Sequence, residues 1–104
     1  MSIIPRYKLL VSYDIQSDQY EAYYRYMMGE FVPTAQQMGL YIYMIWHVAY
    51  GDYPVRQIEF VGDDLTTMQQ AVNSDRWGEL ENRLKTYATN YKRKLIPFRD
   101  GFQF

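Results

Sequence analysis

The sequence contains no cysteine among its 104 residues. Disulfide bonds, thiolate nucleophiles and cysteine-ligated zinc sites are therefore excluded. A chain without cysteine also suits the reducing cytoplasm, where we expect this protein to be located. Only one histidine, His47, is present, and the sequence has neither a glycine-rich phosphate loop nor a Gly-x-Ser-x-Gly motif. We therefore expect no metal site and no cofactor.

Long apolar runs and a strong charge of either sign are also missing. No segment approaches the ~20 apolar residues of a membrane-spanning helix, and the opening MSIIPRYK is too short an apolar stretch for a signal peptide. Eleven basic and twelve acidic residues give a net charge of -1, which argues against a nucleic-acid or membrane partner. The length predicts one domain, residues 1–104, with a single two-layer core.

Aromatic residues, by contrast, make up 18% of the chain and include twelve tyrosines. Tyrosine has a large apolar ring and a hydroxyl that needs a hydrogen-bond partner when it is buried. The tyrosines occur in every segment rather than in one cluster, which favours a core and an interface built from tyrosine. The alternative is a pocket for a flat organic ligand.

The apolar spacing predicts the order strand, helix, strand, strand, helix, strand. Residues 7–15 are the first predicted strand, and residues 91–98, which contain Pro97, are an edge strand. Inside the first helix, Pro33 cannot donate a hydrogen bond to the carbonyl of Gly29, so we expect a kink there and a gap beneath it. The inward stripe of this helix is predicted to contain Tyr20, Tyr24, Met27, Phe31, Ala35 and Met38. The second helical region is predicted to bury Met68, Ala71 and Val72, then Trp77, Leu80, Leu84 and Tyr87.

Residues 40–61 predict a long β-hairpin closed by a turn at 51–54. We expect Trp46 to lie opposite Phe60, because a slip of one residue would mix apolar and polar side chains on both faces. The same register places His47 opposite Glu59. The remaining pairs are Val48 with Ile58, Tyr50 with Arg56, Ala49 with Gln57 and Ile45 with Val61.

This order of elements predicts an α+β fold. It is the ferredoxin-like βαββαβ arrangement, with a four-stranded antiparallel sheet and both helices on one face. The open face is expected to present mostly apolar side chains, namely Tyr41, Tyr43, Ile45, Ala49 and Val61. Phe102 and Phe104 follow the last predicted strand, and the predicted fold of one chain offers these two rings no surface to pack against. Both features predict a homodimer in which the open faces of two sheets pack together.

Several short motifs occur along nearly the whole chain. They are Met38-Gly39-Leu40, Trp46 five residues before Gly51, Phe60, and Ser74-Asp75-Arg76-Trp77. In these motifs the chain resembles the dimeric α+β barrel proteins, and most closely the NIPSNAP-like group. The resemblance implies a ferredoxin-like fold, a homodimer and often a small-molecule pocket between sheet and helices. Relatives in the wider superfamily include cofactor-free monooxygenases, haem-degrading enzymes, cyclases and isomerases, beside members with no known activity.

The first candidate site is the pair of His47 and Glu59. A carboxylate beside an imidazole favours the charged ring and fixes its orientation, so the pair can act as a general acid or base. The alternative is a cross-strand polar pair in a dimer interface. The predicted strand phase favours this alternative, because His47 would then face away from the helices.

The second candidate site lies on the helix-facing side of the sheet and would bind a small aromatic ligand. Its residues are Trp46, Tyr50, Arg56 and Phe60 from the sheet, Tyr24 from the first helix and Trp77 from the second. Arg56, on a mostly apolar face, calls for an anion or a stacked ring, unless its head reaches water. Tyr13 can line either site, because the phase of the first strand is ambiguous.

Three functional classes follow from these features. The first is a small-molecule-binding protein, either a binder or a cofactor-free enzyme of monooxygenase, isomerase or cyclase type, acting on an aromatic or polyketide-like compound. The second is a non-enzymatic dimeric structural or regulatory module, which predicts no enclosed cavity in the monomer. The third is RNA binding, which we do not expect, because the strand VRQIEFV carries Glu59 where a negative charge would repel a nucleic-acid backbone.

Overall fold

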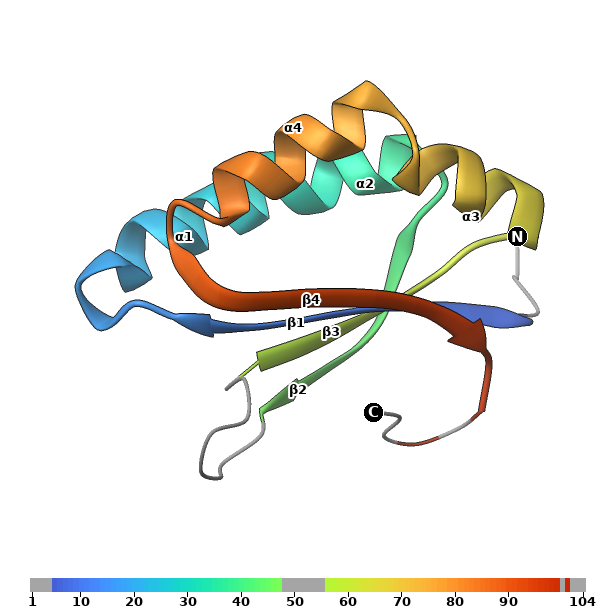
Figure 1. Ribbon diagram of the computed structural model, residues 1–104, viewed down its shortest axis with the longest axis horizontal. Coiled ribbons are helices and arrows are strands. Elements are labelled where there is room, and N and C mark those ends of the chain that lie inside the picture. The colour runs from blue at the N-terminus through green and yellow to red at the C-terminus, as the bar shows by residue number, and fades with distance from the viewer. Residues whose placement is uncertain (1–4, 48–55, 100, 102–104) are drawn as a thin grey trace.

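The structure is a computed structural model that describes residues 5–47, 56–99 and 101. Its elements are β1 (Tyr7–Ile15), η1 (Ser17–Gln19), α1 (Tyr20–Tyr26), η2 (Met27–Phe31), α2 (Val32–Gln37), β2 (Tyr41–His47), β3 (Arg56–Val61), α3 (Leu65–Val72), α4 (Asp75–Leu84) and β4 (Ala88–Pro97). The helices lie together on one side of the sheet (Figure 1). None of the described helices is long and apolar enough to cross a membrane.

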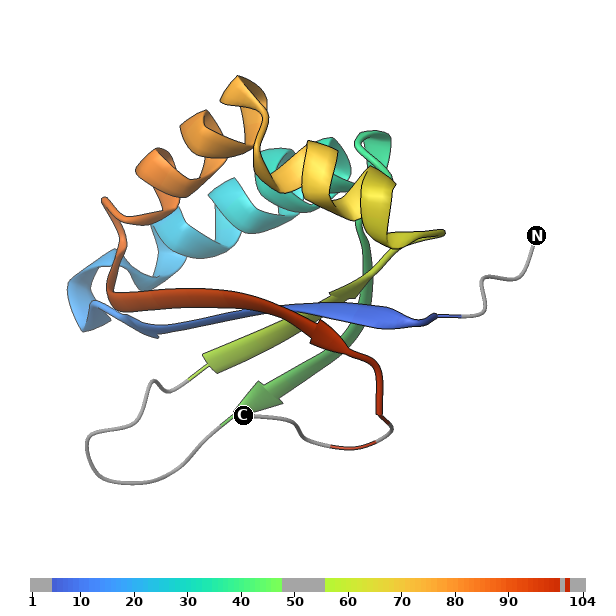
Figure 2. The ribbon, with the colours of Figure 1, turned by 45° about the vertical axis from the view of Figure 1, so that its right-hand side comes forward.

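The four strands form one sheet in the order β2-β3-β1-β4, and every neighbouring pair is antiparallel. The predicted α+β fold with a ferredoxin-like order of elements is therefore confirmed. β2 and β4 are the edge strands, and Pro97 ends β4 as the edge-strand prediction requires. Figure 2 shows the sheet and its helix-free face from a second angle.

The predicted irregularity at Pro33 takes the form of a wide turn, η2. It is a π-helix in which the backbone N–H of Val32 donates to the carbonyl of Met27, five residues back. Because Pro33 has no N–H, the regular hydrogen-bond pattern cannot continue through this point. The helix widens by one residue and then resumes as α2.

The wide turn shifts the inward face of the helix before it. Tyr23, Met27, Phe31 and Ala35 are buried at a constant spacing of four residues. The predicted stripe is therefore right for Met27, Phe31 and Ala35. It is wrong for Tyr20 and Tyr24, which are half exposed, because a turn with one extra residue breaks the 3.6-residue period on which the prediction rested.

The core between sheet and helices is built around three aromatic rings. The Phe31 and Trp77 ring centroids are 5.3 Å apart, and those of Phe60 and Trp77 are 6.2 Å apart, both in edge-to-face contact. All three side chains are fully buried. The Ser74 hydroxyl accepts a hydrogen bond from the backbone N–H of Trp77 at 3.2 Å. Ser74 therefore caps the start of α4, from which the indole of Trp77 extends into the core.

The predicted hairpin register is wrong. Trp46 lies opposite Gln57, and His47 lies opposite Arg56 rather than Glu59. Val61 pairs with Tyr41 instead of Ile45, four residues away, whereas Glu59 pairs with Met44 instead of His47, three residues away, because a β-bulge in β2 lies between Ile42 and Met44. One extra residue in a strand reverses the facing of every side chain beyond it. Trp46 therefore lies on the helix-free face and His47 on the helix-facing side, the opposite of the prediction for each.

The helix-free face is less apolar than predicted. Lys8 and Glu59 form a fully buried ion pair there, with Lys8 Nζ 2.7 Å from Glu59 Oε1. The Lys8 ammonium also donates a hydrogen bond to the Gly101 carbonyl at 3.0 Å, so Gly101 lies against this face. Ile45, predicted on this face, lies opposite Ile58 on the helix side, because it follows the bulge. Ala49, Phe102 and Phe104 lie outside the described residues.

Candidate functional site

A row of three polar side chains crosses one end of the sheet on the helix-facing side. Tyr13 of β1 lies opposite Arg56 of β3, and Arg56 lies opposite His47 of β2. Tyr23 of α1 joins these three side chains from the helix layer. We refer to Tyr13, Tyr23, His47 and Arg56 as the Arg56 cluster.

Hydrogen bonds join the four members of the Arg56 cluster. The hydroxyls of Tyr13 and Tyr23 are 2.6 Å apart. Arg56 Nη1 donates to the Tyr23 hydroxyl at 3.4 Å, and its guanidinium carbon lies 5.7 Å from the Tyr23 ring centroid. Arg56 Nη2 lies 3.0 Å from His47 Nε2. A guanidinium can only donate, so Nε2 accepts and the proton of the neutral imidazole is on Nδ1.

Backbone irregularity helps to place this cluster. β1 and β4 change register between Ser12 and Asp14, so a bulge in the β1–β4 ladder lies beside Tyr13. Asn90, on the bulged side, has a φ of 55° and donates from Nδ2 to Asp14 Oδ2 at 2.8 Å. β-Bulges are enriched beside binding and catalytic sites, where they redirect a side chain.

Charge in the cluster is confined to Arg56. Burial, followed by the neighbouring Tyr23, raises the pKa of the Tyr13 phenol far above its usual value, so this hydroxyl stays protonated. Burial acts to lower the pKa of Arg56, but hydrogen bonding to Tyr23 and Tyr20 outweighs it and the net pKa is raised. Among the described residues, Arg56 Nε is buried without a hydrogen-bond partner.

A pocket of about 70 Å³ lies between the helix layer and the strands β2 and β3, against the wide turn η2. We call it the η2 pocket. It is lined by Tyr23, Tyr24, Met27, Met28, Val32, Ile42, Ile45, Arg56 and Ile58. Arg56 is the one charged residue among these described lining residues. Tyr24, Met28 and Ile45 form its rim, with 53%, 56% and 47% of their surfaces exposed.

The structure brings together some of the predicted site residues. Arg56, Tyr13 and His47 lie in the Arg56 cluster, and Tyr24 lies on the pocket rim. Tyr23 was not predicted, because a regular helical period points Tyr24 inward instead. The signal that could have identified it is Pro33, which forces the wide turn and thereby moves the inward position by one residue.

Other predicted site residues lie elsewhere. Phe60 and Trp77 are packed in the aromatic core. Trp46 and Glu59 lie on the helix-free face, where Trp46 Nε1 donates to Glu59 Oε2 at 2.6 Å. Tyr50 lies outside the described residues. With Lys8 as its counter-ion, Glu59 is held in a buried structural contact rather than beside the imidazole.

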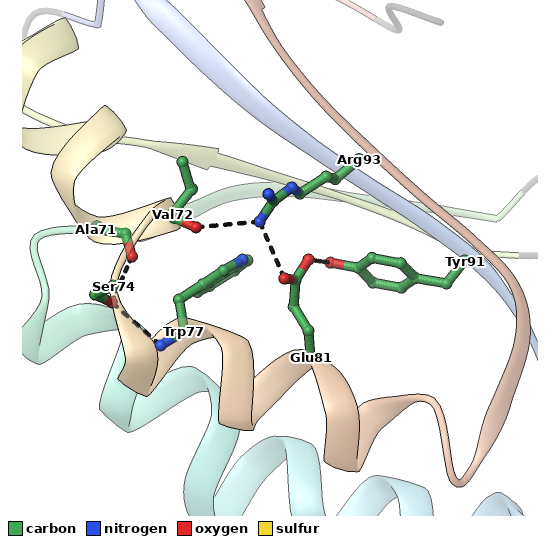
Figure 3. A network of polar contacts seen from close by, with 7 residues as sticks. All are labelled: Ala71, Val72, Ser74, Trp77, Glu81, Tyr91 and Arg93. Carbon is green, nitrogen blue, oxygen red and sulfur yellow. Dashed lines mark hydrogen bonds and ion pairs between the residues drawn. The ribbon is translucent and has the colours of Figure 1, made fainter.

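A second polar network joins α4 to β4 (Figure 3). Arg93 Nη1 donates to Glu81 Oε1 at 3.0 Å and to the Val72 carbonyl at 3.3 Å, while the Tyr91 hydroxyl donates to Glu81 Oε2. Trp77 points from α4 toward the same strand in Figure 3, and its buried Nε1 has no hydrogen-bond partner among the described residues. This network ties a helix to an edge strand. Within the described ranges, no group of three or more His, Cys, Asp and Glu side chains could hold a metal ion.

Comparison with known proteins gives matches in structure but not in sequence. No protein-family model and no curated protein matches the chain. An EthD family protein of Bacillus halodurans superposes with a TM-score of 0.66 at 16% identity, covering 90% of this chain and 99% of that chain. A NIPSNAP domain protein of Burkholderia xenovorans gives a TM-score of 0.63 at 11% identity, over 94% of this chain and 99% of the other.

A third match is a dimeric ferredoxin-like protein from an uncultured marine organism. Its TM-score is 0.63 at 14% identity, with 97% of this chain and 94% of that chain covered. Likeness at such low identity establishes architecture and leaves activity open. The chain therefore has the ferredoxin-like α+β fold that is found in the EthD, NIPSNAP and dimeric ferredoxin-like proteins, which confirms at the level of fold the resemblance in its sequence.

Proposed function

We propose that this chain is a small-molecule-binding protein whose ligand, an apolar or aromatic compound, enters the η2 pocket. The observation that carries the proposal is a half-buried cation, Arg56, on the wall of an otherwise apolar pocket. Small-molecule sites usually combine such an apolar lining with a few placed polar groups. A pocket beside the wide turn also favours ligand binding over a module without any cavity.

Binding comes ahead of catalysis in this proposal. His47 is a proton acceptor at the edge of the cluster, but its Nε2 is occupied by Arg56 at 3.0 Å. A general base must lie within hydrogen-bond reach of the proton that it removes. Turnover by a cofactor-free mechanism would therefore require a ligand that first separates His47 from Arg56.

A panel of small aromatic compounds, screened by thermal shift and then titrated, tests the proposal. We expect at least one compound to raise the melting temperature and to bind Met28→Glu at least about tenfold more weakly, because the substitution places a charge on the apolar rim. Gln70→Glu is the control, since it adds the same charge at an exposed position of α3 that lies outside the pocket lining. No stabilising compound, or equal losses in both variants, would contradict the proposal.

We further propose that the protein is a homodimer in which the helix-free faces pack together. A hollow of about 440 Å³ on this face is lined by Leu10, Ser12, Gln57, Lys92, Arg93 and Lys94. Tyr41, Tyr43 and Met44 of the edge strand β2 are also exposed. An edge strand with exposed apolar side chains is usually covered by a partner, and one structural neighbour is described as dimeric.

Sedimentation of the full chain at micromolar concentration tests the dimer. We expect a particle of twice the 12.6 kDa chain mass. Tyr43→Glu should shift the population toward the single-chain mass, because it places a charge at the interface. Tyr24→Glu, at an exposed tyrosine on the helix side, should not shift it. A wild-type particle of 12.6 kDa would contradict the proposed dimer.

A further inference from the structure

Arg56 of β3 has no carboxylate partner among the described residues, and neither does Arg76 of α4, which donates to Gln37, whereas three other arginines of the described helices and strands do. Arg25 pairs with Glu21, Arg83 with Glu30 and Arg93 with Glu81. Arg56 forms no ion pair among the described residues, although it is the one that lines an apolar pocket. This cation lies beside apolar side chains, where its attraction to a carboxylate is screened less than in bulk water.

The partners that Arg56 does have are weak for a guanidinium. Its Nη1 bond to Tyr23 is long at 3.4 Å, and none of its described acceptors, Tyr23, Tyr20 and His47, is a carboxylate. The Nε donor is buried and unpaired among the described residues. Hydrogen bonds between a guanidinium and an anion are about twice as strong as neutral ones, and a carboxylate can accept two of them at once.

The pocket also limits the shape of the ligand. At about 70 Å³ it has room for a group of a few heavy atoms. A larger apolar body would have to lie along the exposed rim of Tyr24, Met28 and Ile45, where contact with a ligand would cover apolar surface. No carboxylate is among the described lining residues, so nothing on the described wall repels an anion.

We infer that the ligand is an organic anion, with one carboxylate or an equivalent anionic oxygen paired with Arg56 and an apolar body along the rim. This inference rests on the proposed binding function and adds the charge of the ligand to it. Pairing with an anion would satisfy Arg56, and release of Nη2 would free His47 Nε2. Tyr23 also lines the pocket, and its hydroxyl can donate to the same anion when the Tyr13 hydroxyl donates to it.

Two probes of equal shape and different charge test the inference: 2-naphthoate and 2-naphthamide, titrated against the full chain by calorimetry. We expect the wild type to bind the naphthoate at least about tenfold more tightly than the naphthamide, because one charge-assisted pair is worth that much. Raising the salt concentration should weaken binding of the naphthoate alone.

Substitutions at Arg56 assign the preference to one side chain. Arg56→Gln should bring the affinity ratio of the two probes to about one, while Arg56→Lys, which keeps a point charge but loses the planar fork, should keep part of it. Equal binding of both probes by the wild type, or an unchanged affinity ratio in Arg56→Gln, contradicts the inference that the ligand is an anion. Neither result contradicts the proposed ligand pocket. If neither probe binds at millimolar concentration, the anion inference fails, and the panel of aromatic compounds decides the η2 pocket separately. Arg56→Lys decides the matter should Arg56→Gln not fold.

Discussion

Glu59→Leu should lower the free energy of unfolding by about 3–5 kcal/mol, because it leaves the Lys8 ammonium buried without a counter-ion. Both side chains are fully buried, and the Lys8 ammonium has only the Gly101 carbonyl and the Phe98 and Tyr43 rings as other described neighbours. Cation–π contacts with those rings, at 4.8 and 5.5 Å, are too weak to replace a carboxylate. Trp46 Nε1 also loses its acceptor in this variant.

The double variant Lys8→Met/Glu59→Leu distinguishes the energy of the Lys8–Glu59 interaction from the effect of changing each side chain alone. Removing both charges leaves apolar side chains of similar size, so most of the stability lost in Glu59→Leu should return. Equilibrium unfolding in urea, with equal slopes for all variants, measures this. Additive losses in the double variant would mean that the two charges are not coupled.

An exposed ion pair in the same chain provides the control. Arg25 and Glu21 are 75% and 89% exposed and 3.3 Å apart. Glu21→Leu should change the free energy of unfolding by less than about 1 kcal/mol, because water screens this pair. The contrast between Glu21 and Glu59 reports burial rather than charge alone.

The order of elements could be predicted because it depends on local periodicity. Alternating strand formers, a change to helical spacing and the breaks at glycine and proline are all visible within short windows. Phe60 on the helix-facing side also follows from its neighbours Ile58 and Arg56 by simple alternation. These predictions needed no knowledge of what lies across the sheet.

The candidate site could be predicted only in part, because two single-residue insertions decide it. The bulge beside Tyr43 reverses the facing of Trp46 and His47, and the wide turn at Pro33 replaces Tyr24 by Tyr23. Neither insertion changes the composition of a window, so periodicity alone cannot detect it. The bulge becomes favourable only through tertiary contacts, which the sequence does not show directly. Pro33 does mark the helix as irregular, but the spacing of the apolar residues does not tell which tyrosine turns inward.

Arg56 remained a candidate through both errors for a chemical reason. Its predicted importance came from a guanidinium on an apolar strand face, a property that does not depend on which residue lies opposite. His47 and Glu59, by contrast, were linked by register alone, and one bulge placed them on opposite faces. A prediction that rests on the chemistry of one side chain remains valid when the strand register is wrong. A prediction that rests on two residues lying opposite each other does not.

Trp77→Ala should lower the free energy of unfolding by about 3–5 kcal/mol, since it empties the centre of the aromatic core. The indole is fully buried against Phe31 and Phe60, and collapse of the cavity is limited by the rigid sheet beneath. Trp77→Phe should cost less, because it keeps an aromatic ring and removes an Nε1 that has no partner among the described residues.

The same series decides whether Trp77 belongs to the core or to a ligand site. For a core residue, the stability loss appears without any ligand, and Trp77→Phe leaves probe affinity unchanged. Tyr24→Ala serves as the comparison, because Tyr24 lines the rim and is half exposed: it should weaken binding while changing stability by less than about 1 kcal/mol. A stable Trp77→Ala variant with weakened binding would contradict this. It would mean that the indole belongs to the binding site and that the η2 pocket extends to Trp77.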